Sequence, residues 1–440
     1  MSTLGDRRLS RRNLVGAAGV AGAAALAAPS LIRSPRAGAQ DVQQVKALMW
    51  NNSPTIDGNF EKRVQLFNEA YADQYQINLE FLPYDQYWQK LLLSYSAGDI
   101  YDVYFWDVQA YGHYKRDLLL DLQPMVTAAG LFDPAQYPTG LFDPWKFDGQ
   151  NFYALPENLQ TLAFYYNKTL FDAAGLAVPD ESWNWDMVLE AARALTIRDG
   201  DRVSQWGLNL GVLDVWWGMQ TLSWAKGDAF FDQTVEPTAF QFSNPANIET
   251  MRWVQDLIWT EKLVPEPAVM AQDGESIGFS SGRTAMITSG SWDISGRREL
   301  PFEWGMAPLP KWGENRVVPY WMGGWVIAKE SQVAEAAFAW ASWSATEFQP
   351  TMAADGDWIP IQNAARDSEE LVAQMPTGFS SVTQSLADAR LADFYSANNQ
   401  QIWNEVFTPN LTQLLNNEQT PEETAAAIDE AANALLEPAE

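Results

Sequence analysis

The fold is decided by residues 45–106, which read VKALMWNNSPTIDGNFEKRVQLFNEAYADQYQINLEFLPYDQYWQKLLLSYSAGDIYDVYFW. Residues 45–50, 77–82 and 102–105 are short apolar or alternating runs, which predict buried strands. Between them, apolar side chains recur at helical spacing, first after residue 50 and then over residues 84–97. This β-α-β-α-β order predicts a parallel sheet with helices on its faces.

The α/β pattern continues outward from this stretch, with a second run that begins near Ala163. The sequence shows no fixed-period repeat and no low-complexity linker, so it predicts two interleaved sheets rather than two domains in series. Further elements are expected as helices over 183–195, 245–263 and 331–348, the last with Ser331 as N-cap, and as strands over 206–210 and 284–287. A last helix begins at Thr420, where TPEE forms a capping box with proline at the first helical position.

The composition indicates a large folded protein with unusual aromatic content. A chain of 440 residues exceeds one ordinary core and suits two lobes of about 150 to 200 residues. Apolar residues make up 47%, which is ample for a packed interior. The 21 Trp, 15 Tyr and 21 Phe exceed what a core alone requires, so some of these rings are expected to form surfaces for flat ligands.

Charge and cysteine content exclude several classes of function. The formal net charge is −28, and residues 40–440 alone hold 22 basic and 55 acidic residues. Such a field repels phosphate backbones and anionic lipid, which argues against nucleic-acid or membrane-surface binding. With no Cys and a single His, thiol catalysis, disulfides, iron–sulfur clusters and Cys-ligated zinc are excluded, and no metal or organic cofactor is predicted.

Residues 1–39 are predicted to be an export signal. An Arg pair at positions 11 and 12 precedes an apolar Ala/Gly-rich stretch and the small-residue cleavage pattern at 37–39. The pair resembles a twin-arginine signal, and general secretion is the alternative. The product is expected to be soluble, periplasmic or otherwise extracytoplasmic, and not a lipoprotein, because the cysteine that would carry the lipid is missing.

Four sequence patterns resemble extracellular solute-binding proteins of carbohydrate ABC importers, the family that includes maltose-binding protein. Each pattern is weak alone, but their order along the chain is fairly specific. They are SAGDIYDV (96–103) with LLDLQP (119–124); DGQNFYALP (148–156) with FYYNKTLF (164–171), AGL (174–176) and WNW (183–185); FSSGRTAMI (279–287) with GSW (290–292); and GGWVIAKES (323–331).

The resemblance implies a type II periplasmic-binding-protein fold, with two α/β lobes, a hinge of several crossings and a ligand cleft between the lobes. It divides the chain into lobe 1, at 40–156 and about 320–362, and lobe 2, at 157–319 and about 363–440. The implied function is that of a monomeric binding protein that closes on a mono- or oligosaccharide and delivers it to the membrane subunits of a permease. No catalytic residue is implied.

A sugar needs flat aromatic surfaces for its C–H faces and polar groups for its hydroxyls, which are costly to bury without partners. Trp106 ends a predicted parallel strand, where ligands of open α/β sheets bind. The resemblance and these criteria together give a predicted ligand set of Trp106, Asp107, Gln109, Glu157, Gln160, Trp216, Trp217, Trp292, Asp293, Gly323, Gly324 and Trp403.

Structural roles remain open for the same residues. Trp106 or Trp292 could pack beneath its own loop, and Glu157 and Gln160 could be solvated. Two adjacent Trp side chains point in different directions, so one of Trp216 and Trp217 is expected to stack, and Trp217 matches the family better. Trp50 and Trp88, by contrast, are expected in the core because of their strand and helix positions.

Two rival functions are kept. The same fold could bind a polyamine, which would suit an acidic aromatic site, or a glycerol phosphodiester, which would need cleft arginines. An exported glycan-active enzyme is the second alternative, because the chain has 56 Asp and Glu residues from which a catalytic carboxylate pair could be drawn. Nothing marks out such a pair, and the one histidine, His113, lies early in a predicted helix where a structural role is expected.

Overall fold

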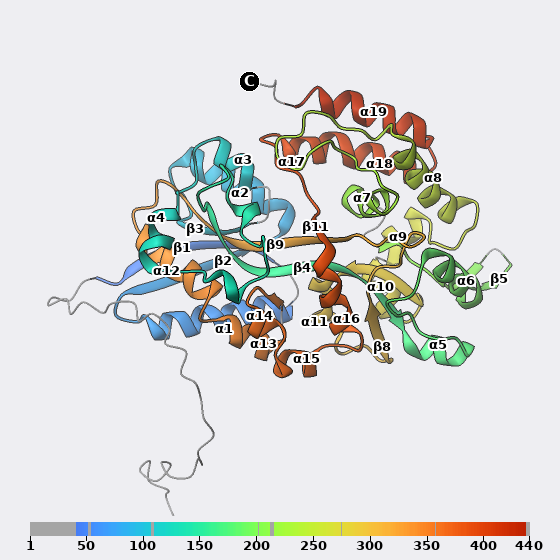
Figure 1. Ribbon diagram of the computed structural model, residues 1–440, viewed down its shortest axis with the longest axis horizontal. Helices are drawn as coiled ribbons and strands as arrows, with labels where there is room; N and C mark the ends of the chain where they lie inside the picture. The colour runs from blue at the N-terminus through green and yellow to red at the C-terminus, as the bar shows by residue number, and fades with distance from the viewer. Residues whose placement is uncertain are drawn as a thin grey trace, which may run out of the picture. The chain divides into compact units, whose positions relative to one another are not determined.

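The computed structural model describes residues 41–51, 54–106, 110–200, 202–211, 215–273, 275–356 and 358–436. The predicted export signal at residues 1–39, together with Asp107 and Gln109, lies outside the described residues. Within these ranges the chain folds into a mixed sheet with helices packed around it (Figure 1).

The main sheet has the strand order β10-β4-β9-β3-β1-β2, with β11 paired to β9 and with β7 and β8 paired to β4. β1 pairs in parallel with both β2 and β3, as the β-α-β-α-β pattern predicts. β5 and β6 form a separate hairpin. The strands are β1 (Gln43–Trp50), β2 (Tyr75–Leu82), β3 (Val103–Trp106), β4 (Ala154–Asn167), β5 (Ile197–Asp199), β6 (Arg202–Gln205), β7 (Met286–Gly290), β8 (Trp304–Ala307), β9 (Val318–Ile327), β10 (Ile359–Pro360) and β11 (Ala389–Leu391).

Helices cover this sheet along its whole length. Their bounds are α1 (Pro54–Ala70), α2 (Tyr84–Ala97), α3 (Ala110–Lys115), α4 (Gln123–Ala129), α5 (Lys168–Ala174), α6 (Trp185–Leu195), α7 (Trp216–Ala225), α8 (Pro245–Trp259), α9 (Pro267–Asp273), α10 (Glu275–Ser280), α11 (Ile294–Arg297), α12 (Ala334–Ala345), α13 (Gln349–Asp355), α14 (Asn363–Arg366), α15 (Glu369–Gln374), α16 (Phe379–Gln384), α17 (Asn399–Gln401), α18 (Thr408–Leu415) and α19 (Pro421–Asn433). The short helix η4 (Ser291–Asp293) precedes α11, and the π-helix η6 (Ile402–Phe407) precedes α18.

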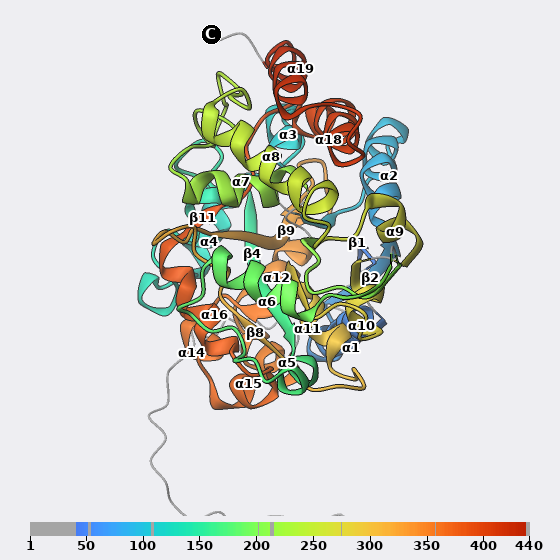
Figure 2. The same cartoon turned by 90° about the vertical axis from the view of Figure 1, so that its right-hand side faces the viewer.

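Two hydrophobic cores lie along the sheet, and β4 contributes to both. The first core gathers around β1, β3, α1, α2 and α12. The second gathers around α6, α7, α8, α18 and α19, of which α8, α18 and α19 lie side by side (Figure 2). Every residue of β4 is buried, and its side chains alternate, so that Tyr165 joins the first core while Phe164 and Tyr166 join the second.

The neighbouring strand β9 joins the same two cores. Met322 and Trp325 are buried in the first core, whereas Trp321 packs against the second. β4 and β9 run antiparallel beside one another through the middle of Figure 1. The lobe bounds expected from the sequence remain a prediction, since some residues between 157 and 319, such as Phe279 and Met306, pack into the first core.

The predicted helix over 84–97 is confirmed to the residue, and the capping box at Thr420 is formed. The expectation for Ser331 was wrong. α12 starts at Ala334, and the Ser331 hydroxyl donates to Asp102 at 2.7 Å and accepts the Val333 N–H at 3.2 Å. A side chain fastened to the turn before β3 is not available to cap the first turn of a helix.

The predicted strand over 206–210 was also wrong. Trp206 and Asn209 form only isolated bridges, to Thr284 and Ile287. Gly207 lies against the carbonyl of Ala192, where a β-carbon would clash, and this close backbone approach explains the irregular path.

Candidate ligand-binding site

Four aromatic side chains meet where β1 and β3 end, and we call them the first aromatic cluster: Trp50, Tyr84, Trp88 and Trp106. Trp50 is the last residue of β1 and Trp106 the last of β3, while the other two lie in the first turns of α2. The ring centroids of Trp50 and Tyr84 are 5.5 Å apart, and those of Trp88 and Trp106 are 4.7 Å apart. Carboxyl ends of adjacent parallel strands meet at one edge of a sheet, which explains the assembly.

The members of this cluster differ in exposure. Tyr84 is 41% exposed, Trp50 and Trp88 are half-buried, and Trp106 is only 2% exposed. Among the described residues, no hydrogen-bond partner is found for the buried indole nitrogens of Trp88 and Trp106. Trp106 therefore lies beneath the cluster, and its outer surface belongs to Trp50, Tyr84 and Trp88.

His113 supports the cluster from below. Its ring centroid lies 4.5 Å from that of Trp106, and its Nδ1 is 3.2 Å from the Tyr104 hydroxyl. Burial lowers the pKa of His113 to about 3, and the nearby Arg116 contributes in the same direction. A neutral, buried imidazole that packs on an indole has a structural role, as its place in the sequence predicts.

Three further Trp residues form a second aromatic cluster: Trp217, Trp292 and Trp321. They come from α7, η4 and β9, and each is half-buried. Ring centroids are 5.0 Å apart for Trp217 and Trp321, 5.8 Å for Trp292 and Trp321, and 6.3 Å for Trp217 and Trp292. All three pairs are edge-to-face, which is a favoured arrangement of aromatic rings. The cluster therefore presents aromatic surface in several orientations.

Trp216 and Trp403, both in the predicted ligand set, lie elsewhere. Trp216 is 1% exposed and packs on Phe394 and Phe407 in the second core. The half-buried Trp403 packs against Trp216 with a centroid distance of 5.9 Å. The helical turn thus sends Trp216 inward and Trp217 toward the second cluster.

Asp293 lies beside the second cluster with one carboxylate oxygen held in place. Oδ2 accepts hydrogen bonds from the Ser289 hydroxyl at 2.5 Å and from the Arg297 guanidinium at 2.8 Å. Arg297 is buried, with its guanidinium against the rings of Tyr165 and Phe279. Both of these hydrogen bonds end on Oδ2, so Oδ1 of the half-buried Asp293 is a candidate acceptor for a ligand hydroxyl.

Gln160 links β4 to the second cluster. It pairs with Trp321 across the sheet, its Oε1 accepts the Ser291 hydroxyl at 2.7 Å, and its Nε2 donates to Asn158 at 3.0 Å. The buried Nδ2 of Asn158 has no partner among the residues described. Buried amide groups are expected to be hydrogen-bonded, so this donor is a candidate for a ligand or a water.

Glu157 is placed in the first core rather than beside either cluster. It is fully buried, and one carboxylate oxygen forms an ion pair with Arg63 while the other accepts the indole N–H of Trp325. Its backbone carbonyl accepts from Gln349 at 2.9 Å. This network ties α1, β4, β9 and α13 together, which is a structural role.

Three glycines are explained by close packing. A β-carbon on Gly323 would clash with Phe105, and one on Gly324 would clash with the Leu155 carbonyl on β4. A β-carbon on Gly290 would collide with the Trp292 ring, so this glycine lets the indole fold back over β7. The first two therefore allow β9 to fit between its neighbours.

β9 connects the two clusters. Gly324 pairs with Trp106 on one side, and three residues earlier Trp321 enters the second cluster. Three residues along a strand span about 10 Å. The two clusters thus lie beside the same short length of β9, where it pairs with β4.

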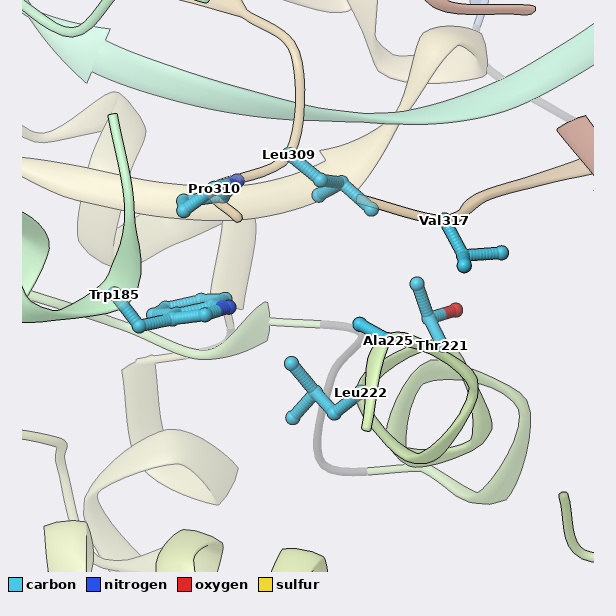
Figure 3. A pocket seen from close by; sticks show the side chains of 7 residues that line it. All are labelled: Trp185, Thr221, Leu222, Ala225, Leu309, Pro310 and Val317. Carbon is cyan, nitrogen blue, oxygen red and sulfur yellow. The ribbon is translucent and has the colours of Figure 1, made fainter. Parts of the chain in front are cut away.

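Two hollows in the described part of the chain are lined by residues outside both clusters. One of about 10 Å³ is enclosed by Trp185, Thr221, Leu222, Ala225, Leu309, Pro310 and Val317, whose side chains face a common space beside α7 (Figure 3). That is room for about one water. A second, of about 500 Å³, lies between the β5–β6 hairpin, α8 and α9 and includes Arg198, Lys262 and Arg283. No group of His, Asp or Glu in the described part of the chain has the arrangement of a metal site.

Comparison with known proteins identifies the family. The model of the bacterial extracellular solute-binding proteins matches residues 51–347. The chain belongs to this family. The resemblance inferred from the four sequence patterns is thereby confirmed.

Similar proteins of known function are binding proteins rather than enzymes. The arabinooligosaccharide-binding protein of Halalkalibacterium halodurans is 24% identical over 278 residues, which are 60% of this chain and 59% of that protein. The maltodextrin-binding protein of Bacillus subtilis is 24% identical over 328 residues, covering 71% of this chain and 70% of that protein.

Solved structures share the fold. An ABC substrate-binding protein of Listeria monocytogenes in complex with cycloalternan has a TM-score of 0.81 at 21% identity, covering 90% of this chain and 99% of its own. The GacH receptor of Streptomyces glaucescens has a TM-score of 0.76 at 18% identity, with 91% of this chain and all of that chain covered. The expected two-lobe α/β fold is confirmed.

Across the described residues, no helix combines the length and apolar character needed to span a membrane.

Sequence reasoning missed four aromatic members of the two clusters. The strand and helix positions of Trp50 and Trp88 predict the core, and no sequence pattern singles out Tyr84 or Trp321 as a ligand residue. One signal was available, because Trp50 ends a parallel strand just as Trp106 does. For Trp321 no local signal exists, since its neighbours Trp217 and Trp292 are distant in sequence.

Proposed function

We propose that this solute-binding protein binds a neutral mono- or oligosaccharide between its two aromatic clusters and delivers it to the membrane subunits of an ABC importer. The observation that carries the proposal is the group of half-buried indoles beside a fixed carboxylate and buried amides in the second cluster, with the rings of the first cluster farther along β9. Aromatic faces suit the C–H faces of a pyranose, and polar groups placed in advance suit its hydroxyls.

The names of similar proteins support a carbohydrate ligand. Relatives are described as arabinooligosaccharide- and maltodextrin-binding proteins, and fold neighbours were solved with cycloalternan or acarbose. The match spans about 60% of the first of these relatives, so the ligand is carried over as a proposal. Binding follows the two-state scheme in which a ligand that touches both lobes favours the closed arrangement.

Export and partnership complete the proposal. Residues 1–39 act as a signal of the twin-arginine type, and the protein works as a soluble monomer in the periplasm or on the extracytoplasmic side. It is not lipid-anchored and performs no chemistry on its ligand. The strongly acidic surface supports a soluble protein that neither coats membranes nor binds nucleic acid.

The test is a ligand panel read by intrinsic Trp fluorescence, thermal stability and calorimetry. The panel contains arabino-, malto- and manno-oligosaccharides of one to four units, a glycerol phosphodiester and a polyamine. We expect a saturable spectral change and a rise in melting temperature for a sugar, with no product released. A response to the polyamine or phosphodiester alone would keep the family and replace the ligand, and turnover of a glycan would reject the proposal.

A matched variant identifies the source of the fluorescence signal. Trp217→Phe removes an indole of the second cluster, whereas Trp253→Phe removes one that packs on Trp185 and Trp312 elsewhere in the second core. The ligand-dependent change should shrink in the first variant and persist in the second.

A further inference from the structure

A bridge of side chains joins the two cores close to the aromatic clusters. Oε1 of Glu236 accepts a hydrogen bond from the Tyr111 hydroxyl at 2.7 Å and an ion-paired hydrogen bond from Lys115 Nζ at 2.7 Å. Both donors lie on α3, and Tyr111 belongs to the first core. Glu236 lies in the loop between Phe231 and Phe240, which both belong to the second core.

The loop holds Glu236 in an unusual backbone conformation. Its φ of 50° falls in the left-handed region, which costs free energy for a residue with a side chain. The surroundings enforce it. The Gln233 side chain donates to the Glu236 carbonyl at 2.7 Å, and the Glu236 N–H donates to the Tyr395 carbonyl at 2.8 Å. The carboxylate is therefore directed toward α3 by its own backbone.

Tyr395 forms a second link between the two cores, next to Glu236. Its N–H donates to the Thr234 carbonyl at 2.7 Å, so it pairs with the loop of the second core. Its hydroxyl donates to the Pro144 carbonyl at 2.9 Å, and its ring lies 5.5 Å from that of Tyr111. The preceding Phe394 is in the second core, so the chain passes from one core to the other at this point.

The bridge is attached to both parts of the candidate site. α3 begins four residues after Trp106 of the first aromatic cluster. On the other side, Phe394 packs on Trp216, the neighbour of Trp217 in the second cluster, with a centroid distance of 5.5 Å. A change in the separation of α3 from the 231–240 loop must therefore change how the two clusters face each other.

We propose that Glu236 is a positioning residue for the ligand site, which holds the two cores together through Tyr111 and Lys115 and so biases the ligand-free protein toward its closed arrangement. The inference rests on the proposed function in that the two clusters share one ligand. The side chains of Glu236 and Lys115 are 51% and 34% exposed, so the bridge is weakened by water and salt. It therefore shifts a population and leaves the ligand to complete closure.

Two observations in the molecule support the bridge as a contact between the cores. The Lys115 and Tyr111 hydrogen bonds lower the pKa of Glu236, so the carboxylate stays charged. Tyr111 is nearly buried and holds its hydroxyl in place.

The experiment compares ligand-free proteins by small-angle X-ray scattering, using the full chain. Glu236→Gln keeps the size of the side chain and removes its charge, and Tyr111→Phe removes only the hydroxyl. Each should raise the ratio of open to closed molecules by about two- to fivefold, seen as a larger radius of gyration. The wild-type protein in about 0.5 M salt should shift in the same direction, since exposed ion pairs are screened.

The matched control is Glu261→Gln. Glu261 pairs with Arg193 at 3.0 Å, has a similar exposure, and lies with its partner on the second core alone. It should leave the scattering unchanged. A merely structural role for Glu236 would lower the melting temperature without changing the radius of gyration, and unchanged scattering in both bridge variants would overturn the proposal.

Failure of this inference and failure of the proposed function give different results. The scattering experiment contains no ligand, so a sugar panel without binders would reject the function and leave the bridge to be judged on its own. If a sugar does bind, its affinity for Glu236→Gln should fall by the same factor by which the closed population falls. An affinity that rises would contradict the proposed direction.

Discussion

The two aromatic clusters lie beside the same part of β9 but are assembled from different parts of the chain. The first comes from one continuous segment, residues 50–106, and forms because adjacent parallel strands end at one edge of the sheet. The second brings together Trp217, Trp292 and Trp321 from three separated segments. One cluster is thus a local product of the β-α-β-α-β pattern, whereas the other exists only after the second core has formed.

The clusters also differ in the polar groups around them. In the second, Asp293 and Gln160 present oxygens and amide groups fixed by Ser289, Arg297 and Ser291. In the first, the contacts among the described residues are mainly between rings, with His113 neutral beneath them. We therefore expect the second cluster to decide which hydroxyls are recognised and the first to supply an apolar wall.

The largest expected effect concerns Glu157 on β4, the strand that pairs with β9 beside the clusters. Glu157→Leu leaves the buried Arg63 guanidinium without its carboxylate partner, and breaking a buried ion pair costs about 3 to 5 kcal/mol of unfolding free energy. Urea unfolding of the ligand-free protein measures the loss. The control Asp172→Asn breaks an exposed pair with Lys168 and should cost far less. Unchanged stability with lost sugar binding would instead support the ligand role predicted from the sequence.

The next effect compares the clusters as ligand surfaces. Trp321→Ala should weaken sugar binding by about 2 to 3 kcal/mol, roughly 30- to 150-fold, because a central indole carries much of the energy of an interface. Trp88→Ala should cost less, because Trp88 provides wall rather than centre. Calorimetry of both variants, with Trp253→Ala as the control outside the clusters, gives the ranking. Equal losses in all three variants would mean a general loss of folding rather than of contact.

The third prediction concerns how folding stability depends on pH through His113, which packs beneath the first cluster. The pKa of His113 is lowered to about 3 in the folded protein, so between that value and its ordinary value of 6.5 the unfolded chain binds the extra proton. Stability should therefore fall as pH falls, with this group contributing about 1.4 kcal/mol of loss by pH 5.5. Comparing pH 7.5 with pH 5.5 for wild type and His113→Gln measures the term. An identical slope in both proteins would show that His113 is protonated or exposed in the native state.

The smallest expected effect concerns the polar edge of the second cluster. Ser289→Ala removes one of the two donors that hold Asp293 Oδ2 and changes little volume. Loss of one hydrogen bond to a charged group should weaken sugar binding by about 1 to 1.5 kcal/mol. The measurement is calorimetry, with unfolding free energy as a check on stability. If affinity stays constant while Asp293→Asn abolishes binding, Arg297 alone holds the carboxylate in position.

Local patterns predicted the part of the site that depends on nearby chain. The helix at 84–97, the parallel pairing of β1 with β2 and β3, and the position of Trp106 at a strand end all follow from periodicity and strand-end rules. The same rules gave no reason to separate Trp50 from the core, because an apolar residue that ends a buried strand has the same pattern whether or not its ring reaches the surface.

Long-range contacts decided the residues on which the prediction and the structure differ. Glu157 follows a suspected crossing in sequence, yet Arg63 and Trp325 bind its carboxylate inside the first core. Ser331 precedes a helix, yet Asp102 holds its hydroxyl. A polar side chain goes to the strongest available partner, and the partner is set by packing between distant segments.

The sequence by itself determined the α/β class, the family, the acidic and cysteine-free character and the wealth of tryptophan. These properties follow from composition and from short periodic patterns, which need no knowledge of distant contacts. Only the tertiary structure decided which indoles are half-exposed, that Trp321 lies beside Trp217 and Trp292, and that Glu236 bridges the cores. The reason is that exposure and partnership belong to pairs of segments, and their pairing is settled when β4 and β9 bring the two cores together.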